Sequence, residues 1–412
     1  MKNHQGATKT ASYSGIICLL LFCSMFAKAY GQATEKPFLF NGEQVAAALA
    51  THAGNSQFPS HLNFNDFGYA KVDYTFDLDL HSKIASIYRK YSPDYASFVA
   101  IDPETGAILS LTSYVRADDF PENFALGASY PAASVFKIIT AANVLDRQLA
   151  SLDTVIPFNG KSTSLYKKQV LEHKDNKYTR RPSLKEAFAK SSNPVFGRLG
   201  VEQIGRDSML NYVGRFGFSR DIVQDLPVKD SQFNLPLMDE WELAEAASGY
   251  TKDILIGPVH AAAIAAAIVN GGQMHAPYAV QQVLDKNNRV LYQGGPKVIG
   301  EPIQPETAKD LLRMMRETVR IGSARKSFRT AHRYKAFTEA SYGGKTGSLT
   351  GYEPRGRYDW FVGYGERYGK KIAYASLIVN KEKWYVRSSR VAFEVLNYFF
   401  KQAKEDTVVA NK

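Results

Sequence analysis

The stretch Tyr130-Pro-Ala-Ala-Ser-Val-Phe-Lys137 opens a long apolar segment, 132–149, whose pattern predicts a helix. Ser134 and Lys137 are three residues apart, so a helix places both side chains on one face, one turn apart. A serine hydroxyl is a good nucleophile only when a neighbouring group accepts its proton. A lysine amine can accept that proton once burial or another cation lowers its pKa. The beginning of a helix also supplies backbone N–H groups that can stabilise a developing oxyanion.

This Ser-x-x-Lys pair is a weak signal by itself, because the sequence holds two further matches. They are Ser164 with Lys167 and Ser323 with Lys326. Ser134 differs from the other two serines because it begins an apolar helix after a proline and two small residues, where a side chain can face a cleft. The sequence therefore favours Ser134 and Lys137 as the reactive pair.

A second polar motif, Ser191-Ser192-Asn193, lies between two expected helices, at 184–190 and from Pro194 toward Ile204. Ser191 could relay a proton to a leaving amine, and the Asn193 amide can hold a peptide group with both a donor and an acceptor. Helix capping is the alternative interpretation, since Ser and Asn are favoured caps.

A third motif, Gly343-Gly-Lys-Thr-Gly-Ser348, lies on an expected strand at 343–350. Its glycines permit close approach of another backbone, and a strand edge can pair with an extended peptide. Lys345 and Thr346 would offer a cation and a hydroxyl to a carboxylate. A glycine-rich bend is the alternative. A phosphate-binding loop is excluded, because the first glycine of that pattern is replaced by Glu339.

The elements around these motifs alternate in a way that predicts the fold class. The expected strands at both ends of the chain are 72–76, 97–102, 107–113, 343–350, 359–364 and 372–380. The expected helices are 44–50, 78–91, 132–149, 184–190, two within 244–269, 305–319 and 391–403. We expect an α+β fold in which helices flank an antiparallel sheet completed by both chain ends, with an inserted helical lobe and a cleft between them.

The N-terminus is a separate segment with the pattern of a secretory signal peptide. Lys2 and Lys9 precede an apolar stretch, 16–26, and small residues suited to cleavage follow near 29–33. The stretch is shorter than the roughly 20 residues of a spanning helix, although a short uncleaved anchor stays open. We expect a signal peptide (1–29), a lead-in segment (30–65), one large domain (66–403) and a C-terminal tail (404–412) in an exported protein of the periplasm or cell envelope.

Composition narrows the possible chemistry. Hydrophobic residues make up 45% and charged residues 22% of the 412-residue chain, as in an ordinary globular protein. Cys18 and Cys23 both lie in the N-terminal segment, so the mature chain would hold no thiol nucleophile, disulfide or thiolate metal site. There is no His-Glu-x-x-His metal motif and no Gly-x-Ser-x-Gly hydrolase motif. We expect neither a metal nor a cofactor.

The formal net charge is +11, and +8 without the three lysines at positions 2, 9 and 28. This charge suits work near anionic cell-wall polymers, and ordinary solubility explains it equally well. We expect no nucleic-acid partner, because 177–181 is the one short basic run. We expect His260 to be packed or capped, and Trp241, Trp360 and Trp384 to belong to the core or a cleft wall.

The order Ser-x-x-Lys, Ser-x-Asn, Lys-Thr-Gly is the signature set of penicillin-binding proteins and serine β-lactamases. Over roughly 66–403 the chain resembles the penicillin-binding protein transpeptidase domain. The resemblance extends to the hairpin at 101–109, to 257–264 with 270–272, to 322–324 and to 360–364. No glycosyltransferase domain precedes residue 66, so we expect a free-standing transpeptidase domain.

The resemblance implies roles for individual residues. Ser134 would be the nucleophile, Lys137 its base and Ser191 the proton relay. The substrate would be bound by Asn193, Lys345, Thr346, Gly347 and Ser348, with the N–H groups of Ser134 and Ser348 as the oxyanion hole. The chain departs mildly from the family, with Ala133 where a glycine is frequent and Ser348 where a threonine is frequent.

The implied function is that of a serine acyltransferase acting on D-Ala-D-Ala peptidoglycan stem peptides, as a D,D-transpeptidase or carboxypeptidase. β-Lactams would be covalent inhibitors, and cell-envelope proteins are possible partners. One alternative is a class D-like β-lactamase, although such enzymes typically carry an apolar residue at the position of Asn193. Another is a non-catalytic relative that binds the wall or a partner, although the intact motif set argues against it.

Overall fold

The computed structural model describes residues 39–52, 58–64, 67–116, 123–235 and 238–410. The expected signal peptide and both cysteines lie outside these ranges. Residues 40–412 form one compact unit. Within the expected lead-in segment, helix α2 (Gly42–Ala50) and strand β1 (His61–Phe64) belong to this unit, and β1 pairs with β2 (Gly68–Tyr74). None of the described helices is long and apolar enough to cross a bilayer.

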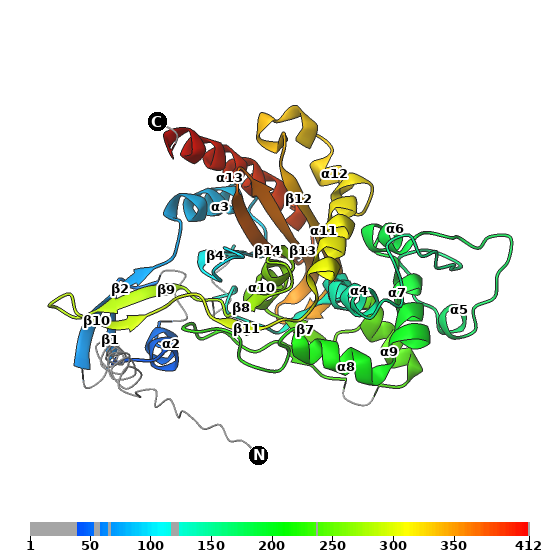
Figure 1. The fold of residues 1–412 in the computed structure, drawn as a ribbon, viewed down its shortest axis with the longest axis horizontal. Coiled ribbons are helices and arrows are strands. Elements are labelled where there is room, and N and C mark those ends of the chain that lie inside the picture. The colour runs from blue at the N-terminus through cyan, green and yellow to red at the C-terminus, as the bar shows by residue number, and fades with distance from the viewer. Residues whose placement is uncertain (1–38, 53–57, 65–66, 117–122, 236–237, 411–412) are drawn as a thin grey trace, which may run out of the picture. The chain divides into compact units, whose positions relative to one another are not determined.

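A five-stranded antiparallel sheet in the order β12-β13-β14-β3-β4 forms the centre of the unit (Figure 1). Its strands are β3 (Tyr95–Ile101), β4 (Ile108–Val115), β12 (Ser341–Tyr352), β13 (Arg355–Arg367) and β14 (Lys370–Asn380). The pairing of β14 with β3 joins the strands from the two ends of the chain. The predicted α+β class, with a sheet completed by both chain ends, is confirmed. β12 stands at one edge of this sheet.

The sheet is buried on both faces, as the alternation along β3 shows. Val99 and Ile101 belong to the core cluster shared with α4 (Lys137–Asp146), α10 (Pro258–Val269) and α11 (Pro305–Arg320). Phe98 and Ala100 point the other way, into the cluster shared with α3 (Leu78–Tyr91) and α13 (Ser388–Ala410). Because successive strand residues face opposite sides, both faces of β3 are covered, and all seven of its residues are buried, Ser97 among otherwise apolar or aromatic side chains.

The remaining elements form the helical lobe and a second sheet. The lobe contains α5 (Lys167–Leu171), α6 (Leu184–Ala189), α7 (Asn193–Leu199), the wider turn η3 (Gly200–Ile204), α8 (Arg206–Arg215) and α9 (Glu240–Ser248). The second sheet has the order β1-β2-β9-β10, with β9 (Val280–Leu284) and β10 (Val290–Gln293). Short strands β8 (Met274–His275) and β11 (Val298–Gly300) pair with each other, and α12 (Arg325–Phe328) precedes β12.

The structure differs from the prediction at two places that shape the site: the helix at 132–149 is divided, and a strand lies between the two helices predicted within 244–269. The single helix expected at 132–149 is a 3₁₀ turn, η2 (Ala133–Phe136), followed by α4. The helix pair expected within 244–269 is separated by a short strand, β7 (Ile254–Ile256), which pairs with β5 (Tyr130–Pro131) and with β6 (Gln232–Phe233). Three apolar residues between helices carry no strand periodicity of their own, so only their pairing partners define β7.

Candidate active site

Ser134 lies in η2, directly after β5, at a point of unusual backbone geometry. Ala133 has φ +49°, in the left-handed region that favours glycine. A glycine would adopt this conformation with less strain than alanine does. Trp360, fully buried in the core, donates from Nε1 to the Pro131 carbonyl oxygen at 2.9 Å and so ties β13 to the strand that precedes Ser134.

Lys137 is fully buried and stands behind Ser134. Its Nζ donates to Ser134 Oγ at 2.8 Å, to Asn193 Oδ1 at 2.7 Å and to the Ser248 carbonyl oxygen. Burial, and then the positive charge of nearby Lys345, hold the pKa of Lys137 well below its ordinary value. The neutral amine is therefore accessible, and that is the form that can accept a proton from Ser134.

Asn193 links Lys137 to the helical lobe. Its Oδ1 accepts from Lys137, its Nδ2 donates to the Thr163 carbonyl oxygen at 2.9 Å, and its backbone N–H donates to the Ser162 carbonyl oxygen at 2.7 Å. The side chain of Ser192, at the beginning of α7, makes no capping hydrogen bond. The Asn193 amide therefore orients the lysine, a contact that the helix-capping interpretation does not provide.

Ser191 joins the second motif to the third. It has φ +57°, and its Oγ accepts a hydrogen bond of 2.8 Å from Lys345 Nζ. Lys345 is fully buried, also donates to the Thr346 carbonyl oxygen at 2.9 Å, and has its Nζ 5.4 Å from the ring centre of Phe188. Burial lowers the pKa of Lys345 to about 7. Both motif lysines thus lie in a dry region beneath the serines that they contact.

Strand β12 lies directly against η2 because Gly347 has no side chain. A Cβ at Gly347 would lie 3.0 Å from Val135 Cγ2 and 3.2 Å from both the Ala132 carbonyl oxygen and the Val135 nitrogen. Such contacts are tighter than ordinary packing allows. Gly347 therefore brings the β12 backbone beside the Ser134 turn, and its neighbour Ser348 is exposed.

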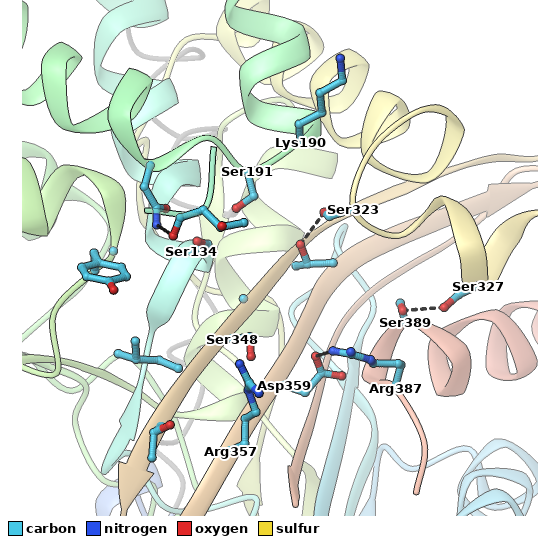
Figure 2. Close-up of a pocket in the computed structure, with 18 of the residues that line it drawn as sticks. Ser134, Lys190, Ser191, Ser323, Ser327, Ser348, Arg357, Asp359, Arg387 and Ser389 are labelled. Carbon is cyan, nitrogen blue, oxygen red and sulfur yellow. Dashed lines mark hydrogen bonds and ion pairs between the residues drawn. The ribbon is translucent and has the colours of Figure 1, made fainter. Parts of the chain in front are cut away.

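A cavity of about 660 Å³ unites the predicted residues, in the size range of ligand sites (Figure 2). Its lining includes Ser134, Ser191, Asn193, Thr346, Gly347 and Ser348. The two remaining predicted residues, Lys137 and Lys345, are buried behind that lining and contact Ser134 and Ser191. The sequence had therefore singled out residues that share one cavity.

Sequence reasoning missed two residues at the end of α9. The Ser248 carbonyl oxygen accepts from Lys137 Nζ. Gly249 has φ +63°, and a Cβ there would lie 2.0 Å from the Ala133 carbonyl oxygen and 3.2 Å from the Ser134 nitrogen. A glycine after an Ala-rich helix is an ordinary helix-ending signal, so nothing local pointed to the nucleophile.

The third missed residue is Ser323, which belongs to one of the two Ser-x-x-Lys matches not favoured as the reactive pair. Ser323 and Lys326 both line the cavity, and Ser323 Oγ lies 2.6 Å from Thr346 Oγ1. The other match, Ser164, is not among the lining residues and donates from Oγ to the Lys161 carbonyl oxygen at 3.0 Å. The Ser323 hydroxyl thus fixes the rotamer of a residue expected to bind the substrate carboxylate.

His260 packs in the core of the protein, away from the cavity. His260 is buried, with Nε2 2.7 Å from the Phe216 carbonyl oxygen, and burial lowers its pKa to about 4. It is thus a packed, neutral histidine. No group of three or more His, Cys, Asp or Glu side chains in the described part of the chain could hold a metal ion.

Comparison with known proteins finds several relatives. Stage V sporulation protein D of Bacillus subtilis is 25% identical over 326 residues, which cover 74% of this chain and 49% of that protein. Peptidoglycan D,D-transpeptidase PbpA of Mycobacterium tuberculosis is 28% identical over 329 residues, covering 70% of this chain and 63% of that protein. The chain thus spans about half the length of the first relative and under two thirds of the second.

Solved structures share the fold. The D,D-transpeptidase domain of a peptidoglycan glycosyltransferase from Eggerthella lenta superposes with a TM-score of 0.65 at 22% identity, covering 88% of this chain and 91% of that one. An imipenem acyl-enzyme complex of penicillin-binding protein A from M. tuberculosis gives 0.64 at 23% identity, covering 80% and 79%. The family model of the penicillin-binding protein transpeptidase domain matches residues 96–401. This chain therefore belongs to the penicillin-binding protein transpeptidase domain family.

Proposed function

We propose that this protein is a serine acyltransferase that acts on peptides ending in D-Ala-D-Ala, as a D,D-transpeptidase or carboxypeptidase, through an acyl-enzyme at Ser134. The observation that carries the proposal is the 2.8 Å contact between Ser134 Oγ and the buried Lys137 amine, in a dry site that lowers the lysine pKa. The names of the relatives, which include peptidoglycan D,D-transpeptidases, support the substrate class.

In the acylation step, Ser134 Oγ attacks the carbonyl carbon between the two D-alanines while Lys137 accepts its proton. The backbone N–H groups of Ser134 and Ser348 stabilise the oxyanion. The bond to the terminal D-Ala then breaks, and the proton that Lys137 accepted passes through the Ser191 hydroxyl to the departing amine, which leaves Lys137 neutral again. Lys345 and Thr346 hold the carboxylate of that D-Ala, and Asn193 holds the peptide while it orients Lys137.

In the second step the acyl group leaves Ser134. An amine from another stem peptide attacks the ester in a transpeptidase, and water attacks it in a carboxypeptidase. Lys137 takes the proton of the attacking group, and Ser134 is reprotonated as the ester bond breaks. The same acyl-enzyme serves both outcomes, so the accepting group decides which reaction the protein performs.

The surroundings of Lys137 argue against rapid β-lactamase turnover of the class D kind. That chemistry modifies the lysine with carbon dioxide and shelters it among apolar side chains. The Lys137 amine instead contacts three oxygen atoms, those of Ser134, Asn193 and Ser248. Because these polar partners favour an unmodified amine, we expect β-lactams to remain bound as a long-lived ester.

The direct test of the proposed function is covalent labelling with a fluorescent penicillin. A β-lactam mimics the D-Ala-D-Ala end, so the protein should become labelled, and Ser134→Ala should abolish the label. Ser164→Ala is the matched control, because Ser164 heads the Ser-x-x-Lys pair that is absent from the cavity lining. Undiminished labelling of Ser134→Ala, with the thermal unfolding transition retained, would overturn the assignment.

We further propose that the protein is exported by its N-terminal segment and works in the periplasm or cell envelope, where its substrate lies. The support is the signal-peptide pattern of residues 1–29 together with a family whose named relatives act on peptidoglycan. N-terminal sequencing of the mature protein should begin between residues 30 and 34. Recovery of the full-length chain from the cytoplasm would contradict export.

A further inference from the structure

The cavity continues past the motif residues, along the face shared by β12 and β13. Thr350 pairs with Arg357 and Ser348 pairs with Asp359 across the two strands. Side chains two apart on a strand share a face, so these residues lie on the same face as Thr346. All of them line the cavity, and Figure 2 shows Arg357, Asp359 and Arg387 together at one end of it, with Ser134 at the other.

The cavity lining carries more positive than negative charge. Four cationic side chains line the cavity as a whole, against one carboxylate, that of Asp359, and two of the four cations, Arg357 and Arg387, lie at the same end as Asp359. Asp359 is buried and already engaged: its Oδ2 accepts from the Ser388 N–H at 2.8 Å, and its Oδ1 lies 3.4 Å from Arg387 Nη1. Arg387 therefore has a counter-charge. Arg357 is exposed and forms no ion pair with any of the described residues.

Trp384 positions the two guanidinium groups. The guanidinium carbon of Arg387 lies 3.6 Å from the Trp384 ring centre, and that of Arg357 lies 5.3 Å from it. A guanidinium near an aromatic ring keeps its N–H groups free to bind an anion, and its planar fork matches a carboxylate. The Arg357 guanidinium is thus held near Trp384 at the rim of the cavity, and it has no anionic partner among the described residues.

We propose that Arg357, supported by Trp384 and Arg387, forms a second carboxylate subsite that recognises the side chain of the residue preceding the two D-alanines in the donor peptide. The inference rests on the proposed function, because it assumes that the terminal carboxylate is held at Thr346. The ligand is a peptide whose third residue from the C-terminus bears a free side-chain carboxylate, and the equivalent carboxamide is disfavoured.

The spacing agrees with this assignment. Thr350, opposite Arg357, is four residues along β12 from Thr346, or about 13 Å at roughly 3.3 Å per residue. A peptide paired with the β12 edge places its third residue about 7 Å along the strand. A side chain of several carbons covers the remaining distance to the guanidinium, whereas a short acidic side chain would not.

The test compares two donor peptides that differ only in a carboxylate or a carboxamide at the end of that long side chain. D-Ala release is measured for both on one preparation of the full chain. We expect the natural protein to prefer the carboxylate by about tenfold or more in kcat/KM, as for other charged hydrogen bonds. Arg357→Gln should reduce the ratio to about one. Because the readout is a ratio, a general loss of activity cancels.

Arg355→Gln is the matched control, since Arg355 lies two residues away on β13, is exposed, and is absent from the cavity lining. It should keep the natural ratio, and 0.5 M NaCl should lower that ratio in the natural protein by screening. A ratio of one in the natural protein, or an unchanged ratio in Arg357→Gln, would overturn the subsite. If penicillin labelling at Ser134 persists in that case, the proposed function stands without it.

Discussion

The Gly249 backbone rests directly on the peptide group between Ala133 and Ser134, so closely that a Cβ at Gly249 would lie 2.0 Å from the Ala133 carbonyl oxygen. The neighbouring carbonyl, that of Ser248, accepts from Lys137. One peptide segment at the end of α9 therefore supports both members of the reactive pair. Because the backbone atoms of the two segments are close-packed, the Ser248–Gly249 segment cannot move without displacing the Ala133–Ser134 peptide.

The first prediction tests this contact through Gly249→Ala. The added methyl group must displace the Ala133–Ser134 peptide, so we expect penicillin acylation to slow by about a hundredfold, the cost of a misplacement of about 1 Å. Gly271→Ala is the control for backbone strain, because Gly271 has φ +66° and nothing within 4 Å of a Cβ. Gly271→Ala should lose about 1–2 kcal/mol of unfolding free energy from left-handed strain alone, and Gly249→Ala should lose more because of the added clash.

The readout for the Gly249 prediction is the rate of labelling beside the thermal transition of each variant. Gly271→Ala should label at the natural rate despite its own loss of stability from backbone strain. Similar slowing in both variants would assign the effect to general destabilisation and would contradict a specific role for the Gly249 contact.

The second prediction concerns the pH dependence of acylation. Lys137 must be neutral to accept a proton, so the rate rises as pH increases through the lowered pKa of Lys137. Lys345 must be charged to bind a carboxylate, so the rate falls as pH rises through about 7, where the free protein loses that proton. A carboxylate-bearing substrate should therefore give a bell-shaped profile of kcat/KM, and a neutral ester should lack the alkaline limb. Identical alkaline limbs for both substrates would refute the role of Lys345.

The third prediction separates the two effects of Lys345. Lys345→Met removes the cation and keeps a long side chain in the buried space. For a carboxylate-bearing substrate we expect a loss of about 1.5–3 kcal/mol in transition-state binding. For a neutral ester the acid limb should move to higher pH, because the Coulombic influence of Lys345 on Lys137 is gone. An unmoved acid limb would show that burial alone sets the Lys137 pKa.

The fourth prediction distinguishes the peptidase from a β-lactamase. We expect the penicilloyl ester to persist for minutes, with D-Ala released faster from a D-Ala-D-Ala peptide. A chromogenic cephalosporin assay and a D-Ala release assay on one preparation, with and without bicarbonate, measure both. Many cephalosporin turnovers per second, dependent on bicarbonate and without D-Ala release, would place the protein in the β-lactamase branch.

The fifth prediction concerns the Ser323–Thr346 contact. Ser323→Ala removes the partner that holds the Thr346 hydroxyl at 2.6 Å, so substrates with a carboxylate should bind more weakly, by about 1 kcal/mol. Ser327→Ala is the control, because Ser327 also lines the cavity but contacts Ser389 instead, at 2.7 Å. The check is KM for the D-Ala-D-Ala peptide in both variants. Equal KM values in the two variants would show that Thr346 needs no support.

Much of the fold was predictable because its elements carry periodic apolar patterns. Helix α3 begins and ends at the predicted residues, Leu78 and Tyr91, since its apolar residues follow one helical face. The three late strands lie at their predicted positions and extend a few residues further at most ends. The ordered motifs likewise predicted residues that the structure places in and behind one cavity.

What the sequence by itself determined is therefore whatever depends on near neighbours: the helices and strands with clear periods, and the motif residues whose types carry chemistry. Only the tertiary structure decided that β7 is a strand, that Ala133 adopts a left-handed conformation, and that Gly249 touches the Ser134 turn. The β5–β7 pairing and the Gly249–Ala133 contact each join residues more than a hundred positions apart. These contacts are stabilised by close packing and hydrogen bonds between segments that are distant in the sequence, so no local pattern of residues predicts them.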